Sequence, residues 1–202
     1  MHKEILTKEQ EELLPLLKLF SKQFGLVGGT AFALHLGHRR SIDFDLFSPK
    51  KFSNITLRKA IEQTRPIQKE LINRLGEFTF MINGVKMTFF HYPFGVKFTE
   101  RFDRGITLPD LVTLAAMKAC ALGQRAKWKD YVDMYFALQH HTLTEIIDKT
   151  MEIFGDSFNS KLFVAQLSYF EDVNYSEIVE YMRGFETDDA RIKKTLIACA
   201  VR

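Results

Sequence analysis

Cysteine, proline and glycine are scarce in this chain, and neither charge dominates. Cys120 and Cys199 lie outside any CxxC pair or metal-ligand spacing, which favours a reducing compartment and excludes a disulfide-stapled scaffold. The 202 residues include 5 prolines and 11 glycines without a low-complexity run, so collagen-like and disordered chains are excluded. The net charge of +3 is too small to indicate nucleic-acid binding by itself.

Long apolar runs are also absent. The best candidate, residues 111–122, is interrupted by Lys118 and is shorter than the ~18 residues of a membrane-spanning helix. The first residues, MHKEILTKEQEELL, are charged and helical in pattern, unlike a signal peptide. We therefore expect a cytoplasmic protein without a membrane segment.

Apolar side chains are plentiful, however. Hydrophobic residues make up 46% of the chain and Phe occurs 19 times, enough for a sizeable core, and the length suggests one domain, or one domain with a helical annex. Helical and two-residue spacings predict that helices and strands alternate in the first half. The expected helices are 3–22, 30–36 (capped by Thr30) and 53–64, and the expected strands are 24–27 and 41–47.

Asn83-Gly84 is the clearest local signal in the chain. This dipeptide between two apolar runs predicts a β-hairpin of strands 78–82 and 85–91 with a type I′ turn. In that register Thr79 faces Thr88, and Glu77 faces Phe90. One face is predicted to join the core, and it consists of Phe78, Phe80, Ile82, Val85, Met87 and Phe89.

The second half is predicted to be helical. The expected helices are 109–122, 128–140, 143–154, 160–170, 175–183 and 188–200. We therefore predict an α/β core with an N-terminal helix over residues 1–105 and a C-terminal helical domain over residues 106–202.

Gly28-Gly29 follows a predicted strand and precedes a predicted helix. Glycine lets an anion approach the main chain, and a helix N-terminus adds favourable partial charge, so this turn is a candidate phosphate site. It lacks the GK[ST] ending of a P-loop.

Asp43 and Asp45 form a DxD pair on the strand that follows. Residues i and i+2 of a strand share a face, and paired carboxylates repel unless a cation joins them. An oxygen-seeking ion that keeps water and phosphate ligands, Mg²⁺, suits such a pair, and Mn²⁺ is an alternative. The competing interpretation is two solvated carboxylates on an exposed strand face.

The run LVGGTAFALHLGHRRSIDFDLFS, residues 26–48, resembles the AbiEii/AbiGii toxin family of polymerase-β-like nucleotidyltransferases. The second half adds Met117–Leu122, then Arg125, then Lys129–Tyr135, similar to the family's MKxxAL, Arg and KDxxDxY stretches. The resemblance implies an α+β fold, with a small mixed sheet flanked by helices and then a C-terminal helical bundle.

The resemblance also implies an enzyme that moves an NMP group from an NTP to RNA, with tRNA favoured, or to a protein hydroxyl. Such an enzyme would be the toxin of a toxin–antitoxin or phage-defence pair, with a cognate antitoxin as partner. Magnesium would be held by Asp43 and Asp45. The implied nucleotide-binding residues are Gly28, Gly29, Thr30, Arg39, Arg125 and Lys129, and the implied catalytic residues are Asp43, Asp45, Lys118 and Asp130.

Several of these assignments have plain structural alternatives. If the helix ran on past Gly123, Lys118, Arg125 and Lys129 would share one face, which could equally be a solvated face. Asp130 and Asp133 are either partners of those bases or surface ion-pair residues. Arg39 is either a phosphate ligand or a flexible surface residue, and a zinc site at His35 and His38 lacks the usual ligand set.

The chain departs from the superfamily at one point. A third carboxylate is usual on a following strand, but residues 84–92 contain no Asp or Glu, and Thr88 occupies the equivalent position. Glu77, on the same face one strand away, is an alternative source of the missing oxygen. The rival function is therefore an inactive module of the same fold that binds NTP or a partner.

Overall fold

The computed structural model describes residues 1–103, 105–122 and 124–201. The chain forms two compact units, and each is described by itself. A sheet unit comprises Met1–His35 and Ser41–Asp110, and a helical unit comprises Leu36–Arg40 and Leu111–Arg202. The protein is thus α+β, as predicted.

The sheet unit is built on a mixed sheet in the order β1-β2-β5-β4-β3. Strand β2 pairs antiparallel with β1 and parallel with β5, and the β5–β4 and β4–β3 pairs are antiparallel. The strands of this sheet are β1 (Gly25–Val27), β2 (Phe44–Ser48), β3 (Lys69–Arg74), β4 (Glu77–Ile82) and β5 (Val85–His91). A separate antiparallel pair consists of β6 (Glu100–Phe102) and β7 (Ile106–Leu108).

The predicted hairpin is confirmed in its turn, register and buried face. Asn83 and Gly84 both have positive φ, 51° and 73°, as a type I′ turn requires. Thr79 pairs with Thr88 and Glu77 with Phe90. The six side chains assigned to the core are buried, each no more than 4% exposed.

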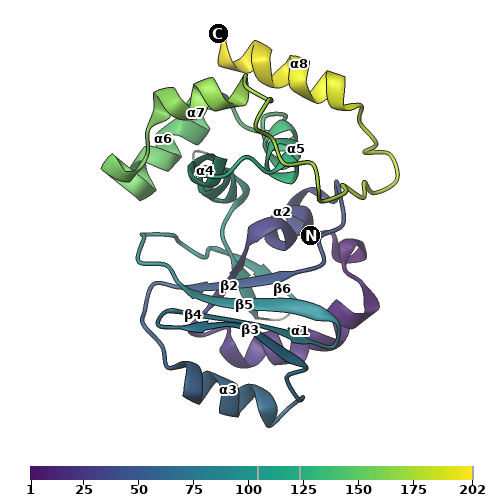
Figure 1. Ribbon diagram of the computed structural model, residues 1–202, viewed down its shortest axis with the longest axis vertical. Coiled ribbons are helices and arrows are strands. Elements are labelled where there is room, and N and C mark those ends of the chain that lie inside the picture. Colours follow the sequence, from purple (N-terminus) through teal and green to yellow (C-terminus); the bar gives the residue numbers. More distant parts are fainter. Residues whose placement is uncertain (104, 123, 202) are drawn as a thin grey trace. The chain divides into compact units, whose positions relative to one another are not determined.

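Helices α1 (Lys8–Phe20) and α3 (Asn54–Glu62) pack on this buried face of the sheet. Phe20, at the end of α1, meets the ring of Phe89 edge-on with centroids 5.3 Å apart. The guanidinium of Arg58, on α3, lies 5.5 Å from the ring centroid of Phe78. Figure 1 shows α1 alongside the sheet and α3 beside the β3–β4 edge.

Helix boundaries in the sheet unit differ from the predictions in two places. The predicted helix 3–22 is a short 3₁₀ turn, η1 (Lys3–Ile5), followed by α1, because a capping box of Thr7 and Gln10 starts the helix at Lys8. Helix α2 (Gly28–Leu36) begins directly after β1, so Thr30 lies inside its first turn, and the prediction that Thr30 caps it is wrong.

The helical unit contains most of the predicted C-terminal helices. They are α4 (Leu111–Leu122), α5 (Trp128–Ala137), α6 (Leu143–Phe154), α7 (Ser160–Leu167) and α8 (Asp189–Ala200), with a 3₁₀ turn η2 (Gly155–Ser157). The predicted helix 175–183 is wrong. That segment is extended, because its backbone pairs elsewhere: Arg40 N donates to Glu180 O, and Met182 N donates to His38 O.

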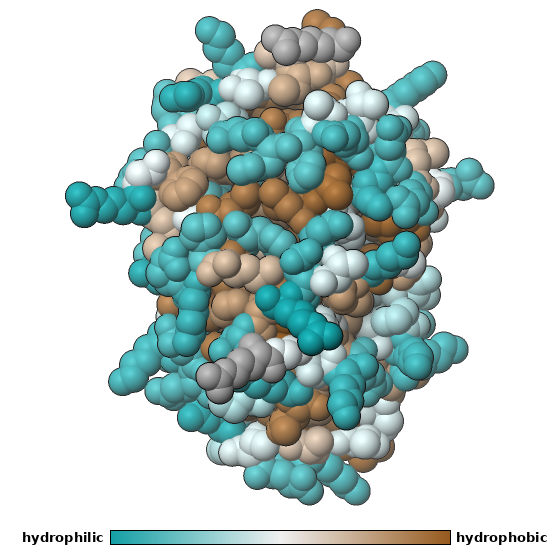
Figure 2. Space-filling model, turned by 180° about the vertical axis from the view of Figure 1, so that it is seen from behind, coloured by the Kyte–Doolittle hydropathy of each residue, from teal (hydrophilic) through white to brown (hydrophobic). Residues whose placement is uncertain are grey.

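No helix among the residues that the structure describes is both long enough and apolar enough to cross a membrane. On the face shown in Figure 2, hydrophilic side chains are interspersed with apolar patches.

The hairpin turn gives a first testable prediction. A Cβ at Gly84 would meet no atom within 4 Å, so Gly84→Ala suffers only from the positive φ of 73°. We expect it to lower the free energy of unfolding by about 1–2 kcal/mol in urea denaturation. Gly95→Ala is the control, since Gly95 has equal space without a positive φ and should leave stability unchanged or slightly higher. Equal effects of the two substitutions would contradict the turn assignment.

Candidate active site

The glycine turn and the DxD strand are in direct contact within the sheet unit. Gly28 has φ of 71°, and a Cβ built on it would lie 2.2 Å from Oδ2 of Asp45. Glycine is therefore required there for two reasons, since the backbone is left-handed and the Asp45 carboxylate fills the space of a side chain. Because α2 starts at Gly28, the backbone N–H groups of its first turn lack partners within the helix.

Thr30 and Gln10 fix the backbone that leads to Asp43. The Thr30 hydroxyl is buried and donates to the carbonyl oxygens of Asp43 and, at 3.3 Å, Ser41. The fully buried Gln10 amide donates to the Ser41 carbonyl at 2.9 Å. These bonds explain why β2 begins at Phe44 and not at the predicted residue 41. The hydroxyl of Thr30 therefore holds the segment before β2 in place. The expected phosphate contact of Thr30 is left to its main-chain N–H group.

Asp45 lies on the more exposed face of β2, and Asp43 is the residue just before β2. Burial alternates along β2, with Phe44, Leu46 and Ser48 buried and the residues between them partly exposed. Lys86 Nζ lies 2.6 Å from Oδ2 of Asp43, so a cation already sits at this carboxylate. The pair offers hard oxygen ligands, and the Asp43 side chain is 35% exposed. This donor set fits Mg²⁺, which commonly binds one or two carboxylates and completes its shell with water and phosphate.

Thr88, the position where the resemblance leads us to expect a third carboxylate, lies beside Asp45 in the sheet. Asp45 pairs with Thr88, and Thr88 pairs in turn with Thr79. Glu77 belongs to a different row of the sheet, opposite Phe90, and forms an ion pair with Arg74 at 2.6 Å. The geometry therefore gives no support to Glu77 as a substitute for the missing acid.

The helical unit holds a buried ionic cluster around Asp133. Asp133 Oδ1 accepts hydrogen bonds from His38 Nε2 at 2.8 Å and from Arg39 Nε at 2.7 Å. Its Oδ2 accepts from Arg39 Nη2 at 2.8 Å and lies 2.8 Å from Lys118 Nζ. Lys118 also pairs with Asp130. Two cations and two anions thus balance each other in the interior, as buried charges require.

Opposing effects set the pKa values in this cluster. Burial raises the pKa of Asp133, but Arg39 and Lys118 outweigh burial and hold that pKa well below its usual value. Burial lowers the pKa of Lys118, but Asp130 and Asp133 outweigh it and leave the pKa of Lys118 raised. For His38, burial prevails over the bond to Asp133, so the pKa of His38 is lowered. The cluster therefore favours the neutral form of His38 and the charged forms of Asp133 and Lys118.

This cluster corrects two interpretations of the sequence. Asp130 and Asp133 are at most 2% exposed, so the surface ion-pair interpretation is wrong. Arg39 is 2% exposed, not a flexible surface residue, and its Nε and Nη2 are engaged by Asp133. Its geometry therefore assigns it a structural role within the helical unit and gives no support to the predicted phosphate contact.

The predicted stripe of bases on one helix face does not form. Helix α4 ends at Leu122 and α5 begins at Trp128, and Gly123 lies outside the described residues. Lys118 and Arg125 nevertheless meet at Asp130, where Arg125 Nε lies 3.2 Å from Oδ2. The Arg125 side chain is 54% exposed, so much of its guanidinium faces solvent. Lys129 instead pairs with Glu177 at 3.3 Å.

The two histidines have partners other than metal. His35 Nε2 bonds to the carbonyl of Pro109 at 2.8 Å, and His38 bonds to Asp133. Among the residues covered by the structure, no group of three or more His, Cys, Asp or Glu could hold a metal ion. The zinc interpretation therefore has no geometric support.

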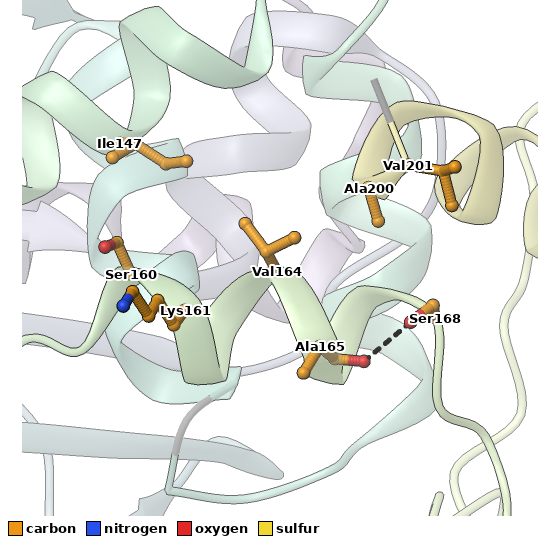
Figure 3. A pocket seen from close by; sticks show the side chains of 8 residues that line it. All are labelled: Ile147, Ser160, Lys161, Val164, Ala165, Ser168, Ala200 and Val201. Atoms are coloured by element: carbon orange, nitrogen blue, oxygen red, sulfur yellow. Dashed lines mark hydrogen bonds between the residues drawn. The ribbon is translucent and has the colours of Figure 1, made fainter.

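A hollow of about 410 Å³ lies in the helical unit. Ile147, Val164 and Val201 give it an apolar lining, and Lys161 lies at its rim (Figure 3). None of the predicted site residues lines it.

Comparison with known proteins identifies the family of this chain. The model of the nucleotidyl transferase AbiEii toxin of type IV toxin–antitoxin systems matches residues 16–195. The chain belongs to the AbiEii nucleotidyltransferase toxin family. Its enzyme class is accordingly nucleotidyltransferase. A relative from Aquifex aeolicus (strain VF5), an uncharacterised protein, is 31% identical over 192 residues, 90% of this chain and 92% of the relative.

Solved structures share the fold of this AbiEii family member. MenT4, a nucleotidyltransferase toxin of Mycobacterium tuberculosis H37Rv, superposes with a TM-score of 0.60 at 15% identity and covers 92% of this chain and 80% of its own. JHP933 from Helicobacter pylori gives 0.58 at 17% identity, with coverage of 97% and 92%. The likeness confirms the predicted nucleotidyltransferase fold.

Contact between Gly28 and Asp45 predicts a selective loss of activity. Gly28→Ala should displace the Asp45 carboxylate and reduce nucleotidyl transfer about 100-fold, the effect of misplacing a reacting group by about 1 Å. Gly84→Ala is the matched control, because Gly84 has nearly the same φ, 73° against 71°, but no neighbour within 4 Å. Rates should be compared at a temperature where both variants are folded. Full activity of Gly28→Ala would refute the role of this contact.

Asp133 is predicted to contribute strongly to stability. Asp133→Asn leaves Arg39 and Lys118 without a full counter-charge, and we expect a loss of about 3–5 kcal/mol in the free energy of unfolding. Glu177→Gln, which breaks exposed pairs, should cost about 1 kcal/mol or less.

The same substitution should change the acid sensitivity. Because the folded pKa of Asp133 is lowered, its stabilisation is complete above its unfolded pKa of about 3.9 and is lost as pH falls through the lower folded value. Urea denaturation between pH 7 and pH 3 should therefore show the gap between wild type and Asp133→Asn narrowing at acid pH. A gap that is constant with pH would contradict the charged cluster.

Proposed function

We propose that this protein transfers a nucleoside monophosphate from an NTP to a hydroxyl of RNA, with tRNA favoured, or of a protein. The observation that carries the proposal is the contact of the Gly28 turn with Asp45, which brings an anion-binding helix start and a carboxylate pair together in an AbiEii family member. The acceptor oxygen would bond to the α-phosphorus as the α–β bridging P–O bond breaks. Pyrophosphate would leave, and the hydroxyl proton would be released.

Each group of residues has a proposed part in this reaction. Main-chain N–H groups of Gly28, Gly29 and Thr30 bind the β- and γ-phosphates, which suit a helix N-terminus. Asp43 and Asp45 hold the divalent ion, Mg²⁺ or Mn²⁺. That ion, when bound, neutralises phosphate charge and lowers the pKa of an attacking hydroxyl.

The helical unit contributes charge in this proposal. Lys118 neutralises triphosphate charge, and Asp130, buried beside it, orients the Lys118 ammonium group. Arg125 and Lys129 bind nucleotide, and the half-exposed Arg125 is the better suited to a phosphate. Catalysis then comes from positioning and charge neutralisation, with no covalent enzyme intermediate.

One observation favours the rival, a module that binds NTP or a partner and transfers nothing. Thr88 stands beside Asp45 in the sheet, where the superfamily usually has its third carboxylate. A threonine hydroxyl cannot accept the proton of the attacking group as a carboxylate can, so the reaction would depend on the two remaining acids. Activity measurements separate these two functions.

The test is label transfer from each α-labelled NTP, with Mg²⁺, to total cellular RNA and protein. We expect label with the unmodified protein and at least an about 100-fold loss in the Asp43→Asn, Asp45→Asn double variant. Nuclease or protease sensitivity of the labelled band then identifies the acceptor class. NTP binding without any labelled product would favour the rival module.

Glu77→Gln is the matched acidic control for that assay. Glu77 lies on the same face of the sheet but pairs with Arg74, so its substitution should leave the transfer rate within about twofold, as for surface positions outside a site. A loss comparable to that of the double variant would restore Glu77 as the third acid.

Membership of a toxin family supports a proposed biological role for this protein. We infer that the protein acts in the cytoplasm as the toxin of a toxin–antitoxin pair with a phage-defence role, and that a cognate antitoxin restrains it. Growth arrest on expression, abolished by the Asp43→Asn, Asp45→Asn substitutions, would support this role.

A further inference from the structure

Aromatic side chains gather on the same face of the sheet as the candidate carboxylates. We call Phe47, Phe90, Tyr92 and Phe94 the aromatic cluster. Ring centroids are 5.3 Å apart for Phe47 and Phe90, 4.9 Å for Phe47 and Tyr92, and 4.8 Å for Tyr92 and Phe94. These pairs are tilted by 42–59°, so within them no ring lies flat on another. All four side chains are partly exposed, unlike the core rings Phe78, Phe80 and Phe89.

Strand geometry places the aromatic cluster next to the DxD pair. Phe47 is two residues beyond Asp45 on β2, and so shares its face at a spacing of roughly 7 Å. Phe90 pairs with Phe47, just as Thr88 pairs with Asp45. Acid groups and aromatic rings therefore form consecutive rows of one surface.

Lysines are frequent in the segments that carry the aromatic cluster, while the acids beside it are Asp45, two residues before Phe47, and Glu77, which lies opposite Phe90 and pairs with Arg74. The stretches 46–61 and 78–99, which carry the four rings, contain no Asp or Glu. The cations in these stretches outside α3 are Lys50, Lys51, Lys86 and Lys97, and Lys86 pairs with Asp43. Tyr92 N donates to the carbonyl of Ser48 at 2.8 Å, which holds Tyr92 beside the last residue of β2. Lys50 and Lys51 follow β2 directly in the sequence.

We propose that the aromatic cluster binds the unpaired bases of a single-stranded RNA that carries the acceptor hydroxyl. This inference rests on the proposed function and decides between its two acceptor classes. Partly exposed rings on a sheet surface, with lysines in the same segments, are a combination that binds single strands through base stacking and phosphate attraction. An acidic peptide would satisfy the charge but has no flat bases to stack on the rings. Bases held on the cluster bring the end of the strand to Asp43 and Asp45.

Binding is tested without catalysis, in the full-length Asp43→Asn, Asp45→Asn protein. Fluorescence anisotropy measures the Kd of a labelled single-stranded RNA 12-mer, the same 12-mer in a duplex, and an abasic 12-mer. Phe47→Leu with Tyr92→Leu removes two ring faces and keeps apolar volume, so the sheet stays folded. Tyr169→Ala, at a 47% exposed ring of the helical unit, is the matched control.

Stacking predicts that the double Leu variant weakens binding of the single strand about tenfold or more, while Tyr169→Ala leaves it unchanged. The Asp43→Asn, Asp45→Asn protein, which is the parent here, should bind the duplex and the abasic strand only weakly. Its Kd for them should be similar to the Kd of the double Leu variant for the single strand. Equal affinity of parent and Leu variant, or equal affinity for the abasic strand, would overturn the proposal. So would labelling of protein alone by the active enzyme. If the aromatic cluster does not bind RNA, transfer of the nucleoside monophosphate to other acceptors can still be measured. A failure of this inference is therefore distinguishable from a failure of the proposed function.

Discussion

Asp133 loses all contact with water on folding, and donors from separate parts of the chain replace that water. His38 and Arg39 precede the DxD strand in sequence, and Lys118 comes from α4. Without them a buried carboxylate would be costly, so the helical unit depends on bringing residues 38–39, α4 and α5 together. The extended segment 174–182 adds to the same assembly, since its backbone bonds to residues 38–40 and 126–128.

In the sheet unit the corresponding constraint is steric. Asp45 lies in the space that any side chain at residue 28 would occupy, and the carbonyls of Ser41 and Asp43 are held by Thr30 and Gln10. The carboxylate pair is thus positioned by a missing Cβ and by buried hydrogen bonds, before any ion or nucleotide arrives. Such preorganisation is what transfer reactions without a covalent intermediate need.

Local chemistry made much of the fold predictable from sequence. Asn83-Gly84 dictated a turn whose register and buried face follow from the two-residue period, and the family motifs indicated the nucleotidyltransferase fold. Strand β3 was missed because all of its residues are exposed and it shows no alternation. The segment 175–183 has helical spacing, but hydrogen bonds to distant backbone hold it extended, and no local pattern reveals those.

In the candidate site, too, features with a local sequence signal could be predicted, and features that depend on long-range contacts could not. Asp43 and Asp45 carry a signal in their two-residue spacing, but the contact of Gly28 with Asp45 depends on the pairing of β1 with β2 and was not anticipated. The partners of Asp133 could not, because Arg39 lies 94 residues away and its burial depends on tertiary packing. Gln10 had a local signal as the fourth residue of a capping box, but its bond to Ser41 spans 31 residues.

Residues 36–40 belong to the helical unit, although the chain on both sides of them belongs to the sheet unit. The main chain therefore passes from one unit to the other after His35, after Arg40 and after Asp110. A fragment that starts at Leu111 would lack His38 and Arg39, so Asp133 would lose the hydrogen bonds from both, while Asp130 would keep Lys118 and Arg125. Gene fusion, circular permutation or evolutionary exchange of the helices must consequently carry residues 36–40 with them, because the buried Asp133 carboxylate otherwise loses the two hydrogen bonds from the Arg39 guanidinium.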